Sequence, residues 1–170
     1  ALGTSVIRVW PGKEGTEQAR ANGTWDSVVE QLRRCGDLAR EADMTVGLEF
    51  HTKTLTDSQA AAEDLMAALD HPAVKLFWQP INGASLEVCK ASLQALLPHV
   101  IALHVFHWTF DEAGQKTIHP LSAGEELWRD YLALARQSPE IAHASLEFVR
   151  DGEPAQMAED AAVLHRLLAS

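Results

Sequence analysis

Cysteine is scarce in this sequence, and long apolar runs are missing. The two cysteines, Cys35 and Cys89, do not have the CxxC spacing of redox or zinc sites. Each falls on the apolar side of a predicted helix, so we expect both to be core thiols in a reducing compartment. No apolar run approaches the roughly 20 residues of a membrane span, so the sequence predicts no membrane partner.

A basic patch is missing too. The chain has 14 Lys and Arg against 24 Asp and Glu, a net charge of -10, and its basic residues are scattered. Such a chain is a poor partner for nucleic acid. The start, Ala1-Leu2-Gly3-Thr4, lacks the basic-then-apolar layout of a signal peptide, so the expected location is the cytoplasm. Neither the GxGxxG of dinucleotide-binding proteins nor a GxSxG nucleophile elbow occurs.

What the sequence does contain is a globular composition and alternating elements. At 170 residues and 46% hydrophobic, it suits a single domain over residues 1–170. Short apolar or β-branched runs predict strands at 5–10, 45–51, 74–79, 100–106 and 144–149, with a weaker one at 117–121. Helical spacing and caps predict helices at 25–42, from Thr56 to before His71, from Ser85, from Ser122 with Glu125, and from Pro154 to the end. The strands are apolar on both faces, which indicates an α/β fold with a parallel sheet; a flavodoxin-like or Rossmann module is the alternative.

The strand at 45–51 ends in a carboxylate and an imidazole, Glu49 and His51. Residues i and i+2 of a strand point to the same face, so these two side chains project together. Every other predicted strand also ends in polar or aromatic groups, and parallel α/β folds bring the carboxyl ends of their strands to one rim where ligands bind. These groups are Arg8 and Trp10, Gln79 and Asn82, His104, His107 and Trp108, and Glu147 and Arg150.

Three of these groups are single ionisable residues inside otherwise apolar strands: Glu49, His104 and Glu147. Burying such a group without a partner is costly, and one divalent cation would remove the cost for all three. With the Gln79 carbonyl they make a mixed oxygen and nitrogen set suited to Mn²⁺, Mg²⁺, Co²⁺ or Zn²⁺. Each residue alone also fits a helix cap, a salt bridge or a hydrogen-bonded core histidine. Trp10 and Trp108 suit either sugar stacking or packing at the rim.

Five segments together resemble the xylose isomerase-like TIM barrels, and more narrowly the sugar phosphate isomerase/epimerase group. They are VGLEFHTKTLTDS, LFWQPINGAS, IALHVFHW, HPLSAGEELWRDYL and SLEFVRDG. The resemblance implies a sugar isomerase or epimerase that holds a divalent metal through Glu49, Gln79, His104 and Glu147. Gln79 departs from the family pattern, which usually has Asp there, and Asn82 stands where many members have His.

The resemblance also implies roles in a reaction that passes through an enediolate of a keto-sugar. Glu49 and Glu147 match the two glutamates that transfer the proton. The candidate substrate-binding residues are His51, Asn82, His107, Trp10, Trp108 and Arg8, the last as one possible phosphate contact. Two other functions stay open: a non-catalytic sugar-binding relative, and a metal phosphodiesterase like endonuclease IV, which the acidic charge disfavours.

The spacing of the matched segments accounts for about six β-α units, resembling the third to eighth strands of a (β/α)8 TIM barrel. A full barrel needs about 250 residues, so the sequence predicts a partial, N-terminally incomplete barrel. A partial barrel leaves two open sheet edges. We therefore expect a homo-oligomer in which a second chain covers them.

Overall fold

The computed structural model describes residues 3–170. The prediction made from residues 1–4 falls partly on Ala1 and Leu2, which lie outside the described residues. The chain forms two compact units. The first comprises the residues up to Trp78 together with Pro98–Ile101, and the second comprises Gln79–Leu97 and Ala102–Ser170. The single domain expected over 1–170 stays a prediction, and each unit is described by itself.

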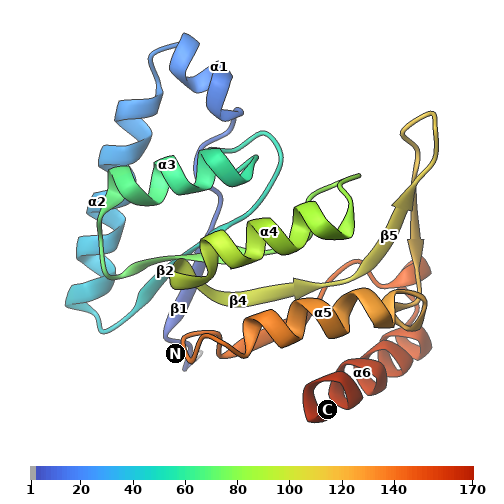
Figure 1. Ribbon diagram of the computed structural model, residues 1–170. Coiled ribbons are helices and arrows are strands. Elements are labelled where there is room, and N and C mark those ends of the chain that lie inside the picture. The colour runs from blue at the N-terminus through green and yellow to red at the C-terminus, as the bar shows by residue number, and fades with distance from the viewer. Residues whose placement is uncertain (1–2) are drawn as a thin grey trace. The chain divides into compact units, whose positions relative to one another are not determined.

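The first unit is built on three parallel strands with helices between them. Its strands are β1 (Val6–Val9), β2 (Thr45–Glu49) and β3 (Val74–Trp78), and its helices are α1 (Thr16–Ala21), α2 (Trp25–Glu41) and α3 (Gln59–Leu69). Helices α2 and α3 pack against each other (Figure 1). Strand β2 is the most buried of the three, and its middle residue must be glycine, because a Cβ at Gly47 would lie 2.1 Å from the ring of Phe77.

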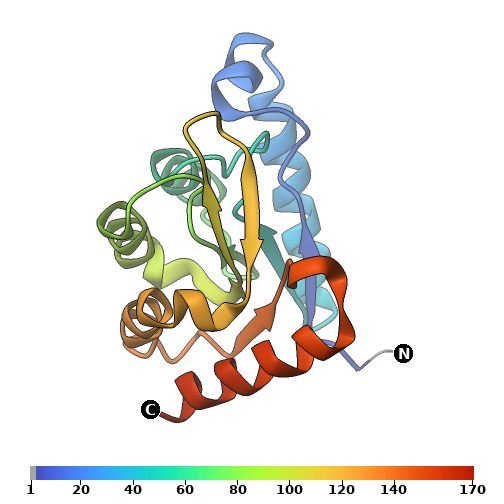
Figure 2. The ribbon, with the colours of Figure 1, turned by 90° about the vertical axis from the view of Figure 1, so that its right-hand side faces the viewer.

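The second unit alternates helices with strands and carries a separate hairpin. Its helices are α4 (Leu86–Leu96), α5 (Glu125–Ala135) and α6 (Pro154–Ala169), and its parallel strands are β4 (Val100–Val105), which starts in the first unit, and β7 (His143–Leu146). Strands β5 (His107–Phe110) and β6 (Lys116–His119) form an antiparallel hairpin, which projects as two opposed arrows in Figure 2. Short 3-10 turns complete the chain: η1 (Leu97–His99), η2 (Leu121–Gly124) and η3 (Arg150–Gly152).

The parallel sheet has the strand order β1-β2-β3-β4-β7, so β1 and β7 are its edges. The predicted α/β class with a parallel sheet is thereby confirmed. Strand β4 is buried along its whole length, which explains why it reads as an apolar run broken only by His104. Within residues 3–170, no helix combines the length and the apolar character needed to cross a membrane.

Several local predictions are wrong. The segment predicted as a barrel strand at 117–121 instead belongs to β6, which pairs antiparallel with β5 in the separate hairpin. Cys35 is exposed rather than in the core, because it does not lie on the face of α2 that buries Val29 and Leu32. Cys89 is buried as expected.

The helix caps also differ from the prediction, and one helix was missed. Helix α3 begins at Gln59 with Ser58 as its cap, whereas Thr56 is buried and bonds elsewhere. Helix α5 begins at Glu125 after Gly124, because Ser122 lies within the 3-10 turn η2 and makes no cap bond. Helix α1 was not predicted at all, because its residues are mostly polar.

Candidate metal and substrate site

In the first unit, a buried carboxylate at the carboxyl end of β2 accepts two hydrogen bonds, one from a charged side chain and one from a polar side chain. Glu49 is only 2% exposed. Arg8 Nη1 and Trp10 Nε1 both donate to Glu49 Oε2, each at 2.5 Å. Arg8 lies in β1 and Trp10 directly follows this strand, so the two donors are alternate residues that face the same side. Charge-assisted hydrogen bonds of this kind are strong and directional, so they fix the orientation of the carboxylate.

The loop after β2 is held by two buried threonines. Thr56 Oγ1 donates to the Glu49 carbonyl at 2.5 Å, and Thr54 Oγ1 donates to the His51 carbonyl at 2.7 Å. His51 stacks on the Trp10 ring with centroids 4.6 Å apart. Its Nδ1 lies 2.6 Å from the Thr52 carbonyl oxygen. A carbonyl oxygen only accepts hydrogen bonds, so Nδ1 must carry the hydrogen. In its neutral form, His51 therefore carries its lone pair on Nε2.

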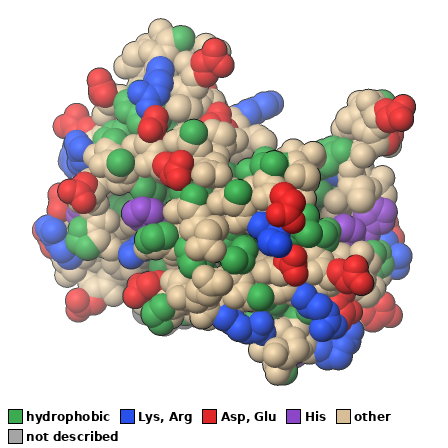
Figure 3. Space-filling view, in the orientation of Figure 1, with side chains coloured by type: hydrophobic (Ala, Val, Ile, Leu, Met, Phe, Trp, Pro, Cys, Tyr) green, Lys and Arg blue, Asp and Glu red, His purple; other side chains and the backbone are tan. Residues whose placement is uncertain are grey.

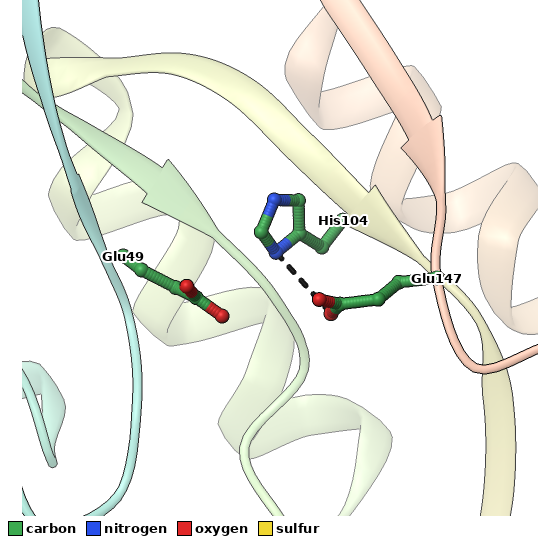
Figure 4. Close-up of side chains that lie close together, drawn as sticks. All are labelled: Glu49, His104 and Glu147. Atoms are coloured by element: carbon green, nitrogen blue, oxygen red, sulfur yellow. Dashed lines mark ion pairs between the residues drawn. The ribbon is translucent and has the colours of Figure 1, made fainter. Parts of the chain in front are cut away.

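In the second unit, two polar side chains converge on one nitrogen of His104. Nδ1 of His104 lies 3.2 Å from Gln79 Oε1 and 3.3 Å from Glu147 Oε2. Figure 4 draws Glu49, His104 and Glu147 and marks the His104–Glu147 pair with a dashed line. Gln79 and His104 are buried, and Glu147 is about one quarter exposed. An amide oxygen, an imidazole nitrogen and a carboxylate oxygen form a donor set that suits Mg²⁺, Mn²⁺, Co²⁺ or Zn²⁺.

Parallel pairing brings Glu147 to this place. Strand β7 pairs with β4 so that Ser145 lies opposite His104, and the backbone N–H of Glu147 continues the ladder by donating to the Val105 carbonyl at 2.9 Å. Successive strand residues alternate sides. The buried strand β4 therefore fixes the imidazole, and the edge strand β7 brings its carboxylate beside it.

The remaining predicted substrate residues are spread over the loop after β3 and the hairpin. Asn82 is exposed. His107 lies opposite His119 in the hairpin and packs on Gly124, where a Cβ would come within 2.6 Å of the imidazole. Burial, and to a lesser extent His119, lower the pKa of His107. His107 and Trp108 line a cavity of about 330 Å³ whose wall also includes Tyr131.

The hairpin also holds groups that the sequence reasoning missed. Lys116 Nζ lies 4.3 Å from the Trp108 ring centroid and 4.7 Å from that of Phe148. Phe106 contacts both rings, at centroid distances of 3.9 Å from Trp108 and 5.5 Å from Phe148. Polar and aromatic residues alternate at 107–110, which is a signal for a strand but does not indicate that it pairs with β6 in a hairpin.

On the face drawn in Figure 3, basic side chains are interspersed among acidic ones rather than gathered in a patch. Histidine side chains, in purple, gather near the base of the β5–β6 hairpin on the same face.

Comparisons with known proteins place this geometry in context. A family model described as "Xylose isomerase-like TIM barrel" matches residues 1–167. No curated protein sequence matches the chain. Among solved structures, a probable 3-DHS dehydratase of petrobactin synthesis from Bacillus anthracis is similar, with a TM-score of 0.73 and 24% identity, over 98% of this chain and 64% of that one.

Two further structures have the same fold. One is a xylose isomerase-like TIM-barrel protein from Mycobacterium smegmatis in complex with magnesium, with a TM-score of 0.69 and 18% identity over 98% of this chain and 62% of that one. The other is D-psicose 3-epimerase with D-tagatose from Clostridium cellulolyticum H10, with a TM-score of 0.59 and 17% identity over 86% of this chain and 57% of that one. The chain thus spans less than two thirds of the length of each of these structures.

Proposed function

Because the chain belongs to the xylose isomerase-like TIM-barrel family, we propose that it is a metal-dependent isomerase or epimerase that acts on a keto-sugar. The family also confirms the predicted fold, a partial TIM barrel. The observation that carries the proposal is the convergence of Gln79 and Glu147 on His104 Nδ1. Epimerases among the similar structures support the same class of reaction.

We propose that the cation is held by Gln79, His104 and Glu147, with Glu49 as the fourth ligand. Glu49, His104 and Glu147 would each offer one ligand atom, and the amide oxygen of Gln79 would offer another. The magnesium in the Mycobacterium smegmatis structure supports a divalent ion. When bound, such a cation supplies the positive charge that stabilises an enediolate next to a carbonyl.

The two glutamates then transfer the proton. One of Glu49 and Glu147 removes the hydrogen from the carbon beside the carbonyl, and the other returns a proton to the opposite face or to the neighbouring carbon. Arg8 and Trp10 hold Glu49 in a fixed orientation for this role through their shared bonds to Oε2. We assign hydroxyl contacts to His51 and His107, and sugar stacking to Trp10 and Trp108.

Gln79 sets this chain apart from a ligand set with three carboxylates. A neutral amide oxygen binds a divalent ion more weakly than a carboxylate does, so we expect weaker metal binding than in relatives with Asp there. The alternative of a non-catalytic sugar-binding relative predicts sugar binding without proton exchange.

Elemental analysis of the purified chain, followed by NMR detection of solvent deuterium entering D-fructose and D-tagatose, tests the proposal. Glu147→Gln is expected to lower both metal content and exchange at least tenfold. Glu87→Gln is the matched control, because Glu87 is an exposed carboxylate on α4. Unchanged metal content and exchange in Glu147→Gln would show that this assignment is wrong.

A dehydratase is the second candidate, favoured by the orientation of His51. Its Nδ1 faces a carbonyl, so its neutral form presents Nε2 as a base beside Glu49. A base that removes the proton between a carbonyl and a β-hydroxyl carbon allows loss of that hydroxyl as water. Incubation with 3-dehydroshikimate, followed by ultraviolet absorbance of the conjugated product, separates this reaction from isomerisation. Product formation that His51→Gln abolishes would favour the dehydratase.

We further propose that a second copy of the chain covers the edge strands β1 and β7. Exposed backbone edges favour pairing with another strand, as does the half-exposed Ile7 on β1. Light scattering across a concentration series tests this proposal, and a monomer at every concentration would contradict it. The cytoplasmic location stays a prediction.

A further inference from the structure

The hairpin of the second unit holds a lysine in an unusual environment. Lys116 extends from β6, and its ammonium lies over the faces of Trp108 and Phe148, 4.3 Å and 4.7 Å from the two ring centroids. The β5–β6 register explains why Lys116 and Trp108 are neighbours, because cross-strand partners share a face. Lys116 lies opposite Phe110, and Ile118 lies opposite Trp108, so all four side chains stand on one side of the hairpin.

Within residues 3–170, Lys116 has no carboxylate in ion-pair contact, although the chain carries a net charge of -10. Two other cations of the second unit do have a carboxylate partner: Lys90 pairs with Asp130 at 3.1 Å, and Arg129 pairs with Glu125 at 2.8 Å. A cation over aromatic faces is attracted by the ring quadrupole, and this attraction does not require it to donate hydrogen bonds to oxygen acceptors. The Lys116 ammonium is thus positioned by the rings while its N–H donors stay available to an anion.

The chain maintains this arrangement at a cost in backbone strain. Phe148 has φ of +52°, in the left-handed region that bulky side chains rarely adopt, and its side chain is 39% exposed. Backbone strain of this kind concentrates at functional sites. Here it lets the Phe148 ring meet Trp108 at 4.8 Å and the Lys116 ammonium, while the preceding residue, Glu147, reaches His104.

We propose that Lys116 binds the anionic group of the substrate, a carboxylate or a phosphate, so that the substrate class is sugar acids or sugar phosphates rather than neutral sugars. The inference rests on the proposed function for the reacting end of the substrate and adds recognition of its charged end. Phe148 links the two, because it follows the proton-transferring Glu147 in sequence and contacts the ammonium that binds the anion.

Three ligands that differ only at carbon 6 test the inference: D-fructose, D-fructose 6-phosphate and D-fructuronate. Their affinities are measured by titration calorimetry on the full chain. We expect the wild-type chain to bind at least one of the two anions about tenfold or more tightly than D-fructose. Lys116→Met keeps the aliphatic stem on the rings and should remove that preference without changing D-fructose binding. Lys116→Arg keeps the charge and should retain most of the preference.

Lys75→Met is the matched control, because it removes the same charge from a half-buried lysine near the amino end of β3. It should leave all three affinities unchanged. If only D-fructose 6-phosphate loses affinity in Lys116→Met, the anion is a phosphate; if only D-fructuronate does, it is a carboxylate. Equal binding of all three ligands by wild type, binding of none, or a Lys116→Met effect on D-fructose as large as on the anions would overturn the inference.

Deuterium exchange measured in the same samples separates this inference from the proposed function. Lys116-dependent binding of an anion without exchange in any ligand removes the isomerase proposal and leaves the anion site. Exchange in D-fructose that Lys116→Met does not alter, with no preference for an anion, leaves the isomerase proposal and removes the anion site.

Discussion

Glu147 Oε2 lies 3.3 Å from Nδ1 of His104; Glu147 directly follows the strand β7, and His104 lies in the fully buried strand β4. Gln79 directly follows β3, and its Oε1 lies 3.2 Å from the same nitrogen. The carboxylate and the amide thus share one imidazole. If the proposed cation binds here, position 79 is the natural place to tune its affinity, because His104 and Glu147 constrain each other.

We expect Gln79→Asp to tighten binding of Mn²⁺ by about tenfold, because it replaces a neutral amide oxygen with a charged carboxylate oxygen. Gln79→Leu should weaken binding by a similar or larger factor. Calorimetric titration with Mn²⁺ measures both changes. Gln59→Asp, at the partly exposed first residue of α3, is the control for the added charge. Equal Mn²⁺ affinity in the Asp and Leu variants at position 79 would exclude it as a ligand.

The second prediction concerns Trp10, which donates to Glu49 and stacks on His51. Trp10→Phe keeps a ring for His51 but removes the donor to the carboxylate. We expect about tenfold slower deuterium exchange, because a hydrogen bond to a charged group is typically worth about 1.5–3 kcal/mol. Trp25→Phe, at the start of α2, serves as the control and should exchange at the wild-type rate. An unchanged rate in Trp10→Phe would mean that this donor does not orient Glu49.

The third prediction tests the close packing of β2 on β3. Gly47→Ala places a Cβ 2.1 Å from the Phe77 ring, so we expect a loss of about 1–3 kcal/mol in the free energy of unfolding. Urea denaturation measures the loss. Phe77→Leu combined with Gly47→Ala should recover part of it, because the smaller side chain withdraws from the added methyl. A double variant less stable than the sum of the two single changes would contradict this account.

The fourth prediction concerns pH. Burial, with a smaller effect of His119, lowers the pKa of His107, so the folded chain binds fewer protons at this residue than the unfolded chain. Its contribution to stability is present above the unfolded pKa of about 6.5 and is lost as the pH falls through the lower folded value. We expect His107→Gln to show a smaller drop in Tm than wild type between about pH 7 and about pH 5. Some slope should remain, because burial and Lys75 also lower the pKa of His99. A slope unchanged by His107→Gln would exclude His107 as its source.

The buried strands and the polar residues at their ends are what the sequence predicts well. Strands β2 and β4 stand out because burial on both sides demands apolar residues, which makes an isolated Glu49 or His104 conspicuous. Gln79 and Glu147 both reach His104 Nδ1, whereas the role of these residues as metal ligands, together with Glu49, stays a proposal.

The hairpin is what the sequence does not predict. Its strands are short and partly exposed, so the sequence predicts a barrel strand at 117–121, where the residues of β6 instead pair with those of β5. No sequence pattern singles out Lys116. The hairpin brings Trp108 to it, and the left-handed backbone of Phe148, which the local sequence does not predict, brings the second ring.

The exposed thiol of Cys35 has a practical consequence for work in solution. With Cys89 buried, oxidation in air can join two molecules through a single covalent bridge at Cys35. Such a bridge would mimic strand-mediated association in a scattering experiment. Samples kept in reductant, or carrying Cys35→Ser, are therefore needed to tell a chemical artefact from true self-assembly.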